Sequence, residues 1–167
     1  MAYNLRSTKI DKTVIKDIKP IKIEIKDIPQ IIEIFKSFWG TTDLYTNAEF
    51  KKTINQNLSY AYKVNDEIIG CCLVEYSTKD NFAEIELLCI RKKYQGNHLG
   101  DSLLSFCINN CCNLNIKKFN LYVSIKNIPA LNLYKKQRFT IQKTIKNYYH
   151  DKNTESNDAY NMILDKT

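Results

Sequence analysis

The sequence predicts a mixed α/β domain in which strands and helices share one sheet. A β-rich run from Phe82 to Ile90 leads into a turn flanked by glycines, and an apolar helical run beginning at Leu103 follows. A further β-rich run at 118–125 completes a strand, turn, helix, strand unit. Upstream, two β-rich runs meet at Asn65-Asp66, which is typical of an antiparallel hairpin. Because both patterns occur in one chain, we expect a mixed sheet flanked by helices.

The first third of the chain is expected to contribute one strand and two helices. Isoleucines alternate with charged residues over 21–25, which is the pattern of a half-buried strand. Asp27 is positioned to cap a helix whose apolar residues recur at helical spacing as far as Phe38. A turn-rich break at 39–43 precedes a second expected helix near 47–57.

In the rest of the chain, β-rich runs alternate with two helical runs. The expected strands are 58–64, 68–76, 82–90, 118–125, 139–149 and 158–164, and the expected helices run from the glycine-flanked turn to about 112 and from 127 to about 137. Pro129 suits the second of these helices, because a residue in the first turn needs no N–H for the helix.

The length and hydropathy of the chain indicate one domain. We expect residues 1–19 to be a polar, lysine-bearing tail and residues 20–167 to be the domain, since 167 residues suffice for one core. The tail lacks the apolar segment of a secretory signal. No apolar run approaches the roughly 20 residues that span a bilayer. A cytoplasmic protein without a membrane partner is therefore predicted.

The cysteine pattern is typical of buried, reduced thiols in a cytosolic protein. Two pairs are adjacent in the sequence, a spacing that neither disulfides nor zinc sites favour. The six cysteines are Cys71, Cys72, Cys89, Cys107, Cys111 and Cys112. The two histidines, His98 and His150, are too far apart in the sequence to suggest a metal site, so no metal is expected.

The chain is basic, with 25 basic and 18 acidic residues and a formal net charge of +7. Such a charge suggests an anionic partner, which could be nucleic acid, an acidic protein surface or a polyphosphate cofactor. The basic residues are spread along the chain without the interleaved aromatics of a single-strand platform. This distribution disfavours nucleic acid, although a basic nucleic-acid-binding module remains an alternative.

The most informative segment is the turn Gln95-Gly96-Asn97-His98-Leu99-Gly100, which links a strand to a helix. Strand, glycine-flanked turn and helix in this order direct backbone N–H groups and a helix N-terminus at phosphates. Two carboxylates, Glu84 and Glu86, share one face of the strand that leads into the turn. These acidic groups thus lie on the strand that leads into the turn, one turn away from the predicted phosphate site.

The order of elements and two motifs resemble the GNAT superfamily of acetyl-CoA-dependent N-acetyltransferases over about 20–166. The first motif has Gln or Arg, two variable residues, Gly, one variable residue, then Gly or Ala, and it falls on 95–100 with His98 in place of the first glycine. The second has an Asn, an Ala, a Tyr and a closing Gly-Phe, and it falls on 127–139 with Arg138 in place of the glycine. A positive φ at His98 would carry a strain cost that glycine avoids.

The C-terminal segment narrows the resemblance within the superfamily. Asn147-Tyr148-Tyr149 followed by Asp158-Ala159-Tyr160-Asn161-Met162 resembles the protein N-terminal acetyltransferases, the group that includes RimI. The resemblance implies a mostly antiparallel seven-stranded sheet, splayed between strands 4 and 5 and flanked by four helices. It also implies acetyl-CoA as co-substrate and a protein N-terminus as acceptor.

The resemblance implies three catalytic candidates. Glu84 lies eleven residues before Gln95, where histone-type relatives carry a glutamate base, and it would act through a bound water. Tyr122 occupies a position where some relatives have a catalytic histidine, and it would hydrogen-bond ordered water. Tyr134 would stabilise the leaving sulfur by hydrogen bonding.

Binding residues follow from the same resemblance. The pantetheine would bind the backbone of Leu88, Cys89 and Ile90, and the pyrophosphate would bind amides of Gln95, Gly96, Asn97, His98, Leu99, Gly100, Asp101 and Ser102, with Asn127 and Tyr134 nearby. The peptide would contact Phe38, Tyr45, Tyr148 and Tyr149.

Two enzyme functions remain open. The first is an N-α-acetyltransferase, with or without an auxiliary subunit. The second is a GNAT enzyme that acetylates a small amine such as glucosamine 6-phosphate, because Lys93-Tyr94-Gln95-Gly96 also resembles the turn of those enzymes. The Tyr-Tyr and Asp-Ala segments favour the first.

Overall fold

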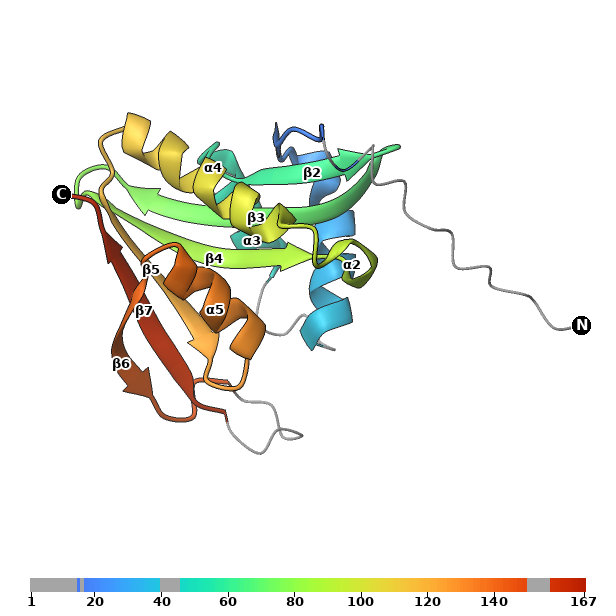
Figure 1. Cartoon of the computed structure of the whole chain (residues 1–167). Coiled ribbons are helices and arrows are strands. Elements are labelled where there is room, and N and C mark those ends of the chain that lie inside the picture. The colour runs from blue at the N-terminus through green and yellow to red at the C-terminus, as the bar shows by residue number, and fades with distance from the viewer. Residues whose placement is uncertain (1–14, 16, 40–45, 150–156) are drawn as a thin grey trace, which may run out of the picture.

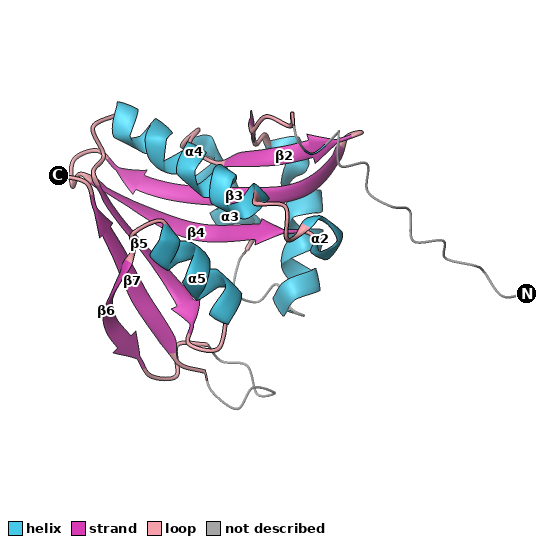
Figure 2. Ribbon diagram, in the orientation of Figure 1, coloured by secondary structure: helices cyan, strands magenta, loops and turns pink. Residues whose placement is uncertain are grey.

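The computed structural model describes residues 15, 17–39, 46–149 and 157–167, which form one seven-stranded sheet with helices on both faces (Figures 1 and 2). The strands are β1 (Ile21–Lys22), β2 (Tyr60–Val64), β3 (Glu67–Ser77), β4 (Phe82–Ile90), β5 (Lys118–Ser124), β6 (Thr140–Ile145) and β7 (Ala159–Asp165). The α-helices of this part are α2 (Ile28–Trp39), α3 (Asn47–Asn55), α4 (Leu99–Asn113) and α5 (Ile128–Lys136), with 3-10 turns η1 (Ile25–Asp27) and η2 (Lys92–Tyr94).

The sheet has the strand order β1-β2-β3-β4-β5-β7-β6, and every neighbouring pair is antiparallel except β4 and β5. The parallel pair is joined through α4, and its register covers only 82–84 against 118–120. Beyond these residues the two strands diverge (Figure 1). The predicted mixed sheet, splayed between strands 4 and 5, is therefore confirmed.

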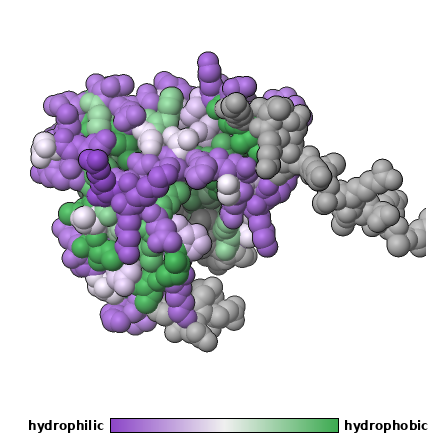
Figure 3. Space-filling view, in the orientation of Figure 1, coloured by the Kyte–Doolittle hydropathy of each residue, from purple (hydrophilic) through white to green (hydrophobic). Residues whose placement is uncertain are grey.

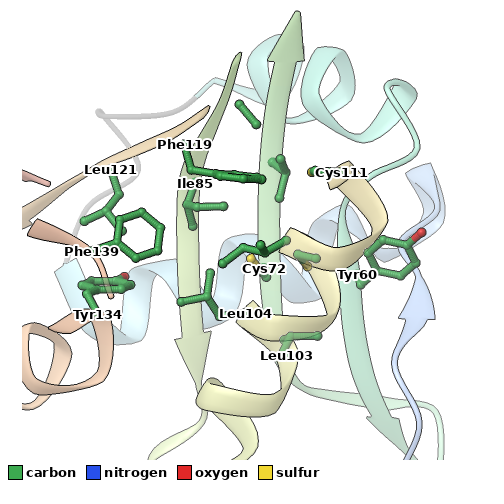
Figure 4. Close-up of a cluster of buried hydrophobic side chains, with 14 of the residues drawn as sticks. Tyr60, Cys72, Ile85, Leu103, Leu104, Cys111, Phe119, Leu121, Tyr134 and Phe139 are labelled. Atoms are coloured by element: carbon green, nitrogen blue, oxygen red, sulfur yellow. The ribbon is translucent and has the colours of Figure 1, made fainter. Parts of the chain in front are cut away.

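Two hydrophobic clusters hold the layers together. On one face, α4 and α5 pack over residues such as Phe119, Leu121 and Ile85 (Figure 4). On the other face, α2 and α3 cover a second cluster, in which the rings of Phe35 and Phe50 meet edge to face at 6.2 Å. Burying each large apolar side chain contributes about 1.5–3 kcal/mol, so the helices are fixed against the sheet by their apolar faces.

A β-bulge in β4 changes which face its side chains meet. Leu73 pairs with Leu87 and Val74 with Ile85, so Glu86 is an extra residue on this strand. Before the bulge Ile85 joins the cluster under α4, whereas after it Leu87 joins the cluster under α2 and α3. Bulges bend a strand and re-aim its side chains, and this one lies where β4 leaves β5.

The hairpin between β2 and β3 confirms the turn expected at Asn65-Asp66. Both residues have positive φ, +48° and +63°, as a two-residue primed turn requires. Asparagine and aspartate tolerate this conformation better than most residues, which explains the turn without a glycine.

The strand expected over 21–25 is wrong beyond Lys22. Of the three isoleucines, Ile23 is buried, while Ile21 and Ile25 are exposed. The chain turns into η1 because Asp27 accepts a hydrogen bond from the backbone N–H of Glu24 at 3.0 Å, closing a capping box. Asp27 thus caps this short turn, ahead of α2.

The strand expected at 139–149 is shorter in the structure, ending at Ile145. The chain leaves the sheet there because Asn147 has a positive φ of +52° and its N–H donates to Asp158.

Near the N-terminus, Ile15 is buried in the cluster under α4, so apolar contact reaches into the segment expected to be a polar tail. The tail boundary itself stays a prediction.

All six cysteines carry free thiols, and five of them are buried, as predicted. Cys71 and Cys89 face each other across β3 and β4 with their sulfurs 3.4 Å apart. Burial raises the pKa of Cys111 to about 12, so its thiol stays protonated. No helix in the described ranges combines the length and apolar character needed to cross a membrane.

Candidate active site

The cleft between β4 and β5 opens at one register position. Glu84 pairs with Asn120, and no later residue of β4 pairs with β5, although β4 remains paired with β3 as far as Ile90. The edge of β4 that faces β5 therefore keeps main-chain groups available to an extended ligand. Leu88, Cys89 and Ile90, the predicted pantetheine contacts, lie along this stretch.

The turn after β4 is held by its own side chains. Gln95 Nε2 donates to the carbonyl of Ile90 at 2.9 Å, and Asn97 Nδ2 donates to the carbonyl of Tyr94 at 3.1 Å. Gly96 and His98 both have positive φ, +78° and +59°. His98, the residue immediately before α4, thus adopts the left-handed conformation to which the sequence analysis assigned a strain cost.

The first turn of α4 presents N–H groups that have no acceptor within the helix. These groups, together with the partial positive charge of the helix N-terminus, favour a bound anion. The turn borders an open pocket of about 400 Å³, lined by Ile15, Ile18, Gly96, Asn97, His98, Leu99 and Ser102. Five of the eight predicted pyrophosphate residues thus line this pocket, next to the helix N-terminus that favours an anion.

Asp101 places a carboxylate in this first turn, close to the expected phosphates. Lys136 and Gln137 of the α5 end both bind it, and Lys136 lowers its pKa. The paired charge repels an incoming anion less than a free carboxylate would. The contact also fixes α5 against α4, and Gly100 allows the close approach, since a Cβ there would lie 3.1 Å from Leu133 Cδ1.

Tyr134 lies on α5 and is buried against the core, its ring 5.9 Å from that of Phe139 (Figure 4). Burial raises the pKa of its hydroxyl well above the ordinary value of 10, with a smaller contribution from Cys72. The hydroxyl consequently stays protonated, and it can act as a hydrogen-bond donor.

At the end of α5, Arg138 stands where the second motif has a glycine, and it adopts the conformation that glycine favours. Arg138 has a φ of +68°, and the N–H of Phe139 donates to the carbonyl of Tyr134 at 3.0 Å. The N–H of Arg138 donates to the carbonyl of Lys135 at 2.9 Å, which completes a Schellman motif. At the start of α5, Asn127 Oδ1 accepts from the N–H of Ala130, so this predicted coenzyme residue is a helix cap.

Acidic and aromatic side chains gather on the other side of the cleft. Glu84 and Glu86 are half-buried, and burial raises the pKa of both carboxyls. Tyr122 stacks on Tyr148 with ring centres 4.8 Å apart, and Tyr149 meets Tyr148 edge to face at 5.0 Å. Burial is also the main cause that raises the pKa of Tyr122, to which the negative charges of both glutamates add.

A second set of contacts fixes the hairpin that carries the two tyrosines. Asp158 accepts from Lys146 Nζ at 2.6 Å and from the N–H of Asn147 at 3.1 Å. Tyr149 donates its N–H to the carbonyl of Asn157 at 2.9 Å. The Asp-Ala segment singled out in the sequence thus closes the base of this hairpin.

The peptide side of the site is described in part. Phe38 is 42% exposed near the end of α2, whereas Tyr45 lies outside the described residues. Arg91 links this helix to the turn that follows β4: its Nη1 donates to Glu33 at 2.9 Å, and its Nε donates to the carbonyl of Ile68 at 2.8 Å.

The molecular surface is hollowed between α4 and α5, with polar side chains along the upper rim of the hollow (Figure 3).

Asn120 is a residue that the sequence analysis missed. It is nine-tenths buried beside Glu84, and its side-chain oxygen has no hydrogen-bond partner in the described part of the chain. The alternation that put Leu121 and Val123 on the core face also puts Asn120 and Tyr122 on the opposite face, so the pattern contained the signal.

Comparisons with known proteins agree with this geometry. A protein of Bacillus subtilis (strain 168), whose inferred activity is that of a ribosomal protein bS18-alanine N-acetyltransferase, is 28% identical over 132 residues, covering 77% of this chain and 85% of that protein. The crystal structure of the NatC complex bound to Gag peptide and CoA contains a chain with a TM-score of 0.78 and 21% identity, covering 90% of this chain and 99% of that one. Arabidopsis thaliana Naa50 in complex with the bisubstrate analogue CoA-Ac-MVNAL has a TM-score of 0.77 and 23% identity, covering 87% and 97%.

The family model of the GNAT acetyltransferases matches residues 27–139, which is more than half of the chain. The matched range contains both motifs, the splayed strands and the turn before α4. The chain therefore belongs to the GNAT family of acetyltransferases, enzymes that use acetyl-CoA as co-substrate.

Proposed function

We propose that this enzyme transfers acetyl from acetyl-CoA to the N-terminal α-amine of a protein, by direct attack within a ternary complex. The observation that carries the proposal is the cluster of Tyr122, Tyr148 and Tyr149 beside two half-buried carboxylates, close to the point where β4 and β5 begin to separate. Stacked tyrosines offer flat apolar faces and hydroxyls, which suit an extended peptide. The Bacillus relative and the Naa50 complex support the same acceptor class.

The acceptor amine must lose a proton before it attacks. An α-amine with a pKa near 8 is about 10% neutral at pH 7, and its deprotonation costs about 1.4 kcal/mol. A lysine amine with a pKa near 10.4 is neutral about once in 2,500, which costs about 4.6 kcal/mol. A weak base acting through water suffices for the first but supplies too little for the second.

Glu84 is the proposed base. Burial raises its pKa and so strengthens it as a base, while hydrogen bonding by Asn120 partly offsets that rise. Acting through one water, the carboxylate would accept the proton that the α-ammonium releases. Tyr122, half-buried on the neighbouring strand, would hold ordered water in this path with its hydroxyl.

Tyr134 is the proposed partner of the leaving sulfur. Its hydroxyl would donate a hydrogen bond to the thiolate as the thioester breaks. Because its pKa is raised by burial, complete proton transfer to a thiolate of pKa about 8.5 is uphill, by about 1.4 kcal/mol for each unit of difference. Tyr134 thus stabilises the charge, and the proton arrives as the product leaves.

The test measures CoA release with three acceptors: peptides with free N-termini, the same peptides with formylated N-termini and an internal lysine, and glucosamine 6-phosphate. We expect turnover with the free peptides alone. Turnover of the sugar phosphate alone would establish the small-amine alternative, and equal turnover of formylated peptides would establish lysine acetylation. Activity of the purified chain without a second protein would decide whether an auxiliary subunit is required.

A further inference from the structure

Asn120 occupies the position at which the sheet begins to open. It pairs with Glu84 in the last register position shared by β4 and β5. Its neighbours Phe119 and Leu121 point into the cluster under α4, so the Asn120 side chain lies on the opposite face, as does that of Tyr122. Asn120 is therefore at the closed end of the cleft, next to the proposed base.

The nitrogen and the oxygen of the Asn120 side-chain amide differ in their hydrogen-bond partners. Its N–H₂ group lies close enough to the Glu84 carboxylate and to the Tyr122 hydroxyl to lower the pKa of both, and Glu84 is its partner in the strand register. Its Oδ1 is buried and has no hydrogen-bond partner among the described residues. Buried acceptors in native proteins are nearly always satisfied, by protein or by ordered water. An orphaned acceptor beside a reacting carboxylate therefore points to a bound donor.

Asn161 provides a comparison within the same protein. It is also buried, on β7, and its Nδ2 donates to the carbonyl of Leu121 at 3.3 Å. This contact joins two paired strands and has no link to Glu84. A structural role for a buried asparagine thus looks different from the arrangement at Asn120.

We propose that Asn120 is a positioning residue that holds Glu84 with its amide N–H and orients the relay water with its Oδ1. The inference rests on the proposed function. A water that donates one O–H to Glu84 and the other to Asn120 has both hydrogens engaged, so it presents a lone pair to the substrate ammonium. The ammonium gives a proton to this water as the water gives one to Glu84, which leaves a neutral amine, a neutral carboxyl and an unchanged Asn120.

Water suits this position better than the amine itself. Asn120 is only 8% exposed, at the end of the cleft where the strands are still paired. The attacking amine carries a peptide and must reach the thioester, which the family pattern places farther along β4 near Leu88–Ile90. A single water bonded to Glu84, Asn120 and the amine would have the three partners that a buried water typically makes.

The first experiment measures the pKa of the Glu84 carboxyl by NMR in the enzyme without substrates. Asn120→Leu removes the donor that favours the charged carboxylate, so the pKa should rise by about one to two units. Asn161→Leu is the matched control and should leave it unchanged. Asn120→Ser, whose side chain is too short to reach Glu84, replaces the leucine variant if that variant does not fold. An unchanged pKa in the Asn120 variant would overturn the proposal.

The second experiment is a double-mutant cycle on peptide acetylation at pH 7. Asn120→Leu should lower kcat about tenfold with an unchanged KM for acetyl-CoA, since a neutral α-amine is a one-in-ten species at this pH. In a Glu84→Gln background the same substitution should cause no further loss. If the two substitutions lower kcat by factors that multiply in the double variant, Asn120 does not act through Glu84. If the wild type acetylates no peptide, the proposed function fails, while the NMR titration still decides whether Asn120 holds Glu84.

Discussion

Replacing Arg138 with glycine should stabilise the protein. Arg138 is held at a φ of +68° by the Schellman motif that ends α5, a conformation that costs a residue with a Cβ about 1–2 kcal/mol. Glycine adopts it freely but loses about 0.5–1 kcal/mol more backbone entropy on folding. The net gain therefore centres on about 0.75 kcal/mol and is at most about 1.5 kcal/mol; the central value raises Tm by about 1.5–3 °C for a domain of this size.

The assay compares the thermal unfolding of Arg138→Gly with that of Arg138→Ala. Both variants remove the guanidinium and its interaction with the helix dipole, but alanine retains the Cβ, so their difference isolates the backbone effect. We expect the glycine variant to melt above the alanine variant. If it melts at the same temperature or lower, the strain assigned to this residue is wrong.

Three other substitutions test the site. Tyr134→Phe should lower kcat about 10- to 100-fold, the loss of one hydrogen bond to a developing charge, with little change in the Kd of acetyl-CoA; equal losses in both would exclude a leaving-group role. Glu84→Gln should lower the acetylation rate about tenfold at pH 7 and progressively less above pH 8, where the α-amine is neutral without a base. The wild-type rate should itself fall as acid protonates Glu84 through its raised pKa. If the pH profiles of variant and wild type have the same shape, Glu84 is not part of the mechanism. Lys146 lowers the pKa of Asp158, so the stability it contributes is present above about pH 3.9 and is lost as the pH falls through the lower folded value. Asp158→Asn should accordingly lower Tm at pH 7 but not at pH 2, and it should raise the KM of the peptide alone; a Tm deficit that persists in acid would contradict this assignment.

The sequence predicted those features that depend on local chemistry. The Asn65-Asp66 turn and the turn around Gly96 follow from residues that tolerate positive φ, and the order of strands and helices follows from hydrophobic period. The strand at 21–25 was predicted too long because its alternation is typical of a strand throughout, whereas the chain turns into η1 at the Asp27 capping box.

Features that depend on pairing between distant segments were not predictable from local pattern. The bulge at Glu86 is visible only when β4 is aligned with β3, and no local propensity marks it. The pairing of Glu84 with Asn120 depends on the register of a crossover connection, which the lengths of the intervening elements do not fix. The stacking of Tyr148 on Tyr122 likewise joins a hairpin to a strand more than twenty residues away in the sequence.

Arg91 connects α2, β3 and the turn that follows β4. Its guanidinium donates hydrogen bonds to Glu33 on α2 and to a backbone carbonyl of β3. Its backbone N–H donates to the carbonyl of Ile69 at 2.8 Å, and the chain continues from Arg91 directly into the turn. Under the proposed function, a peptide that shifts α2 would pull on the turn proposed to bind the nucleotide, and a bound nucleotide would resist that shift. Because such coupling is reciprocal, whichever substrate binds first would alter the affinity for the second by the same factor.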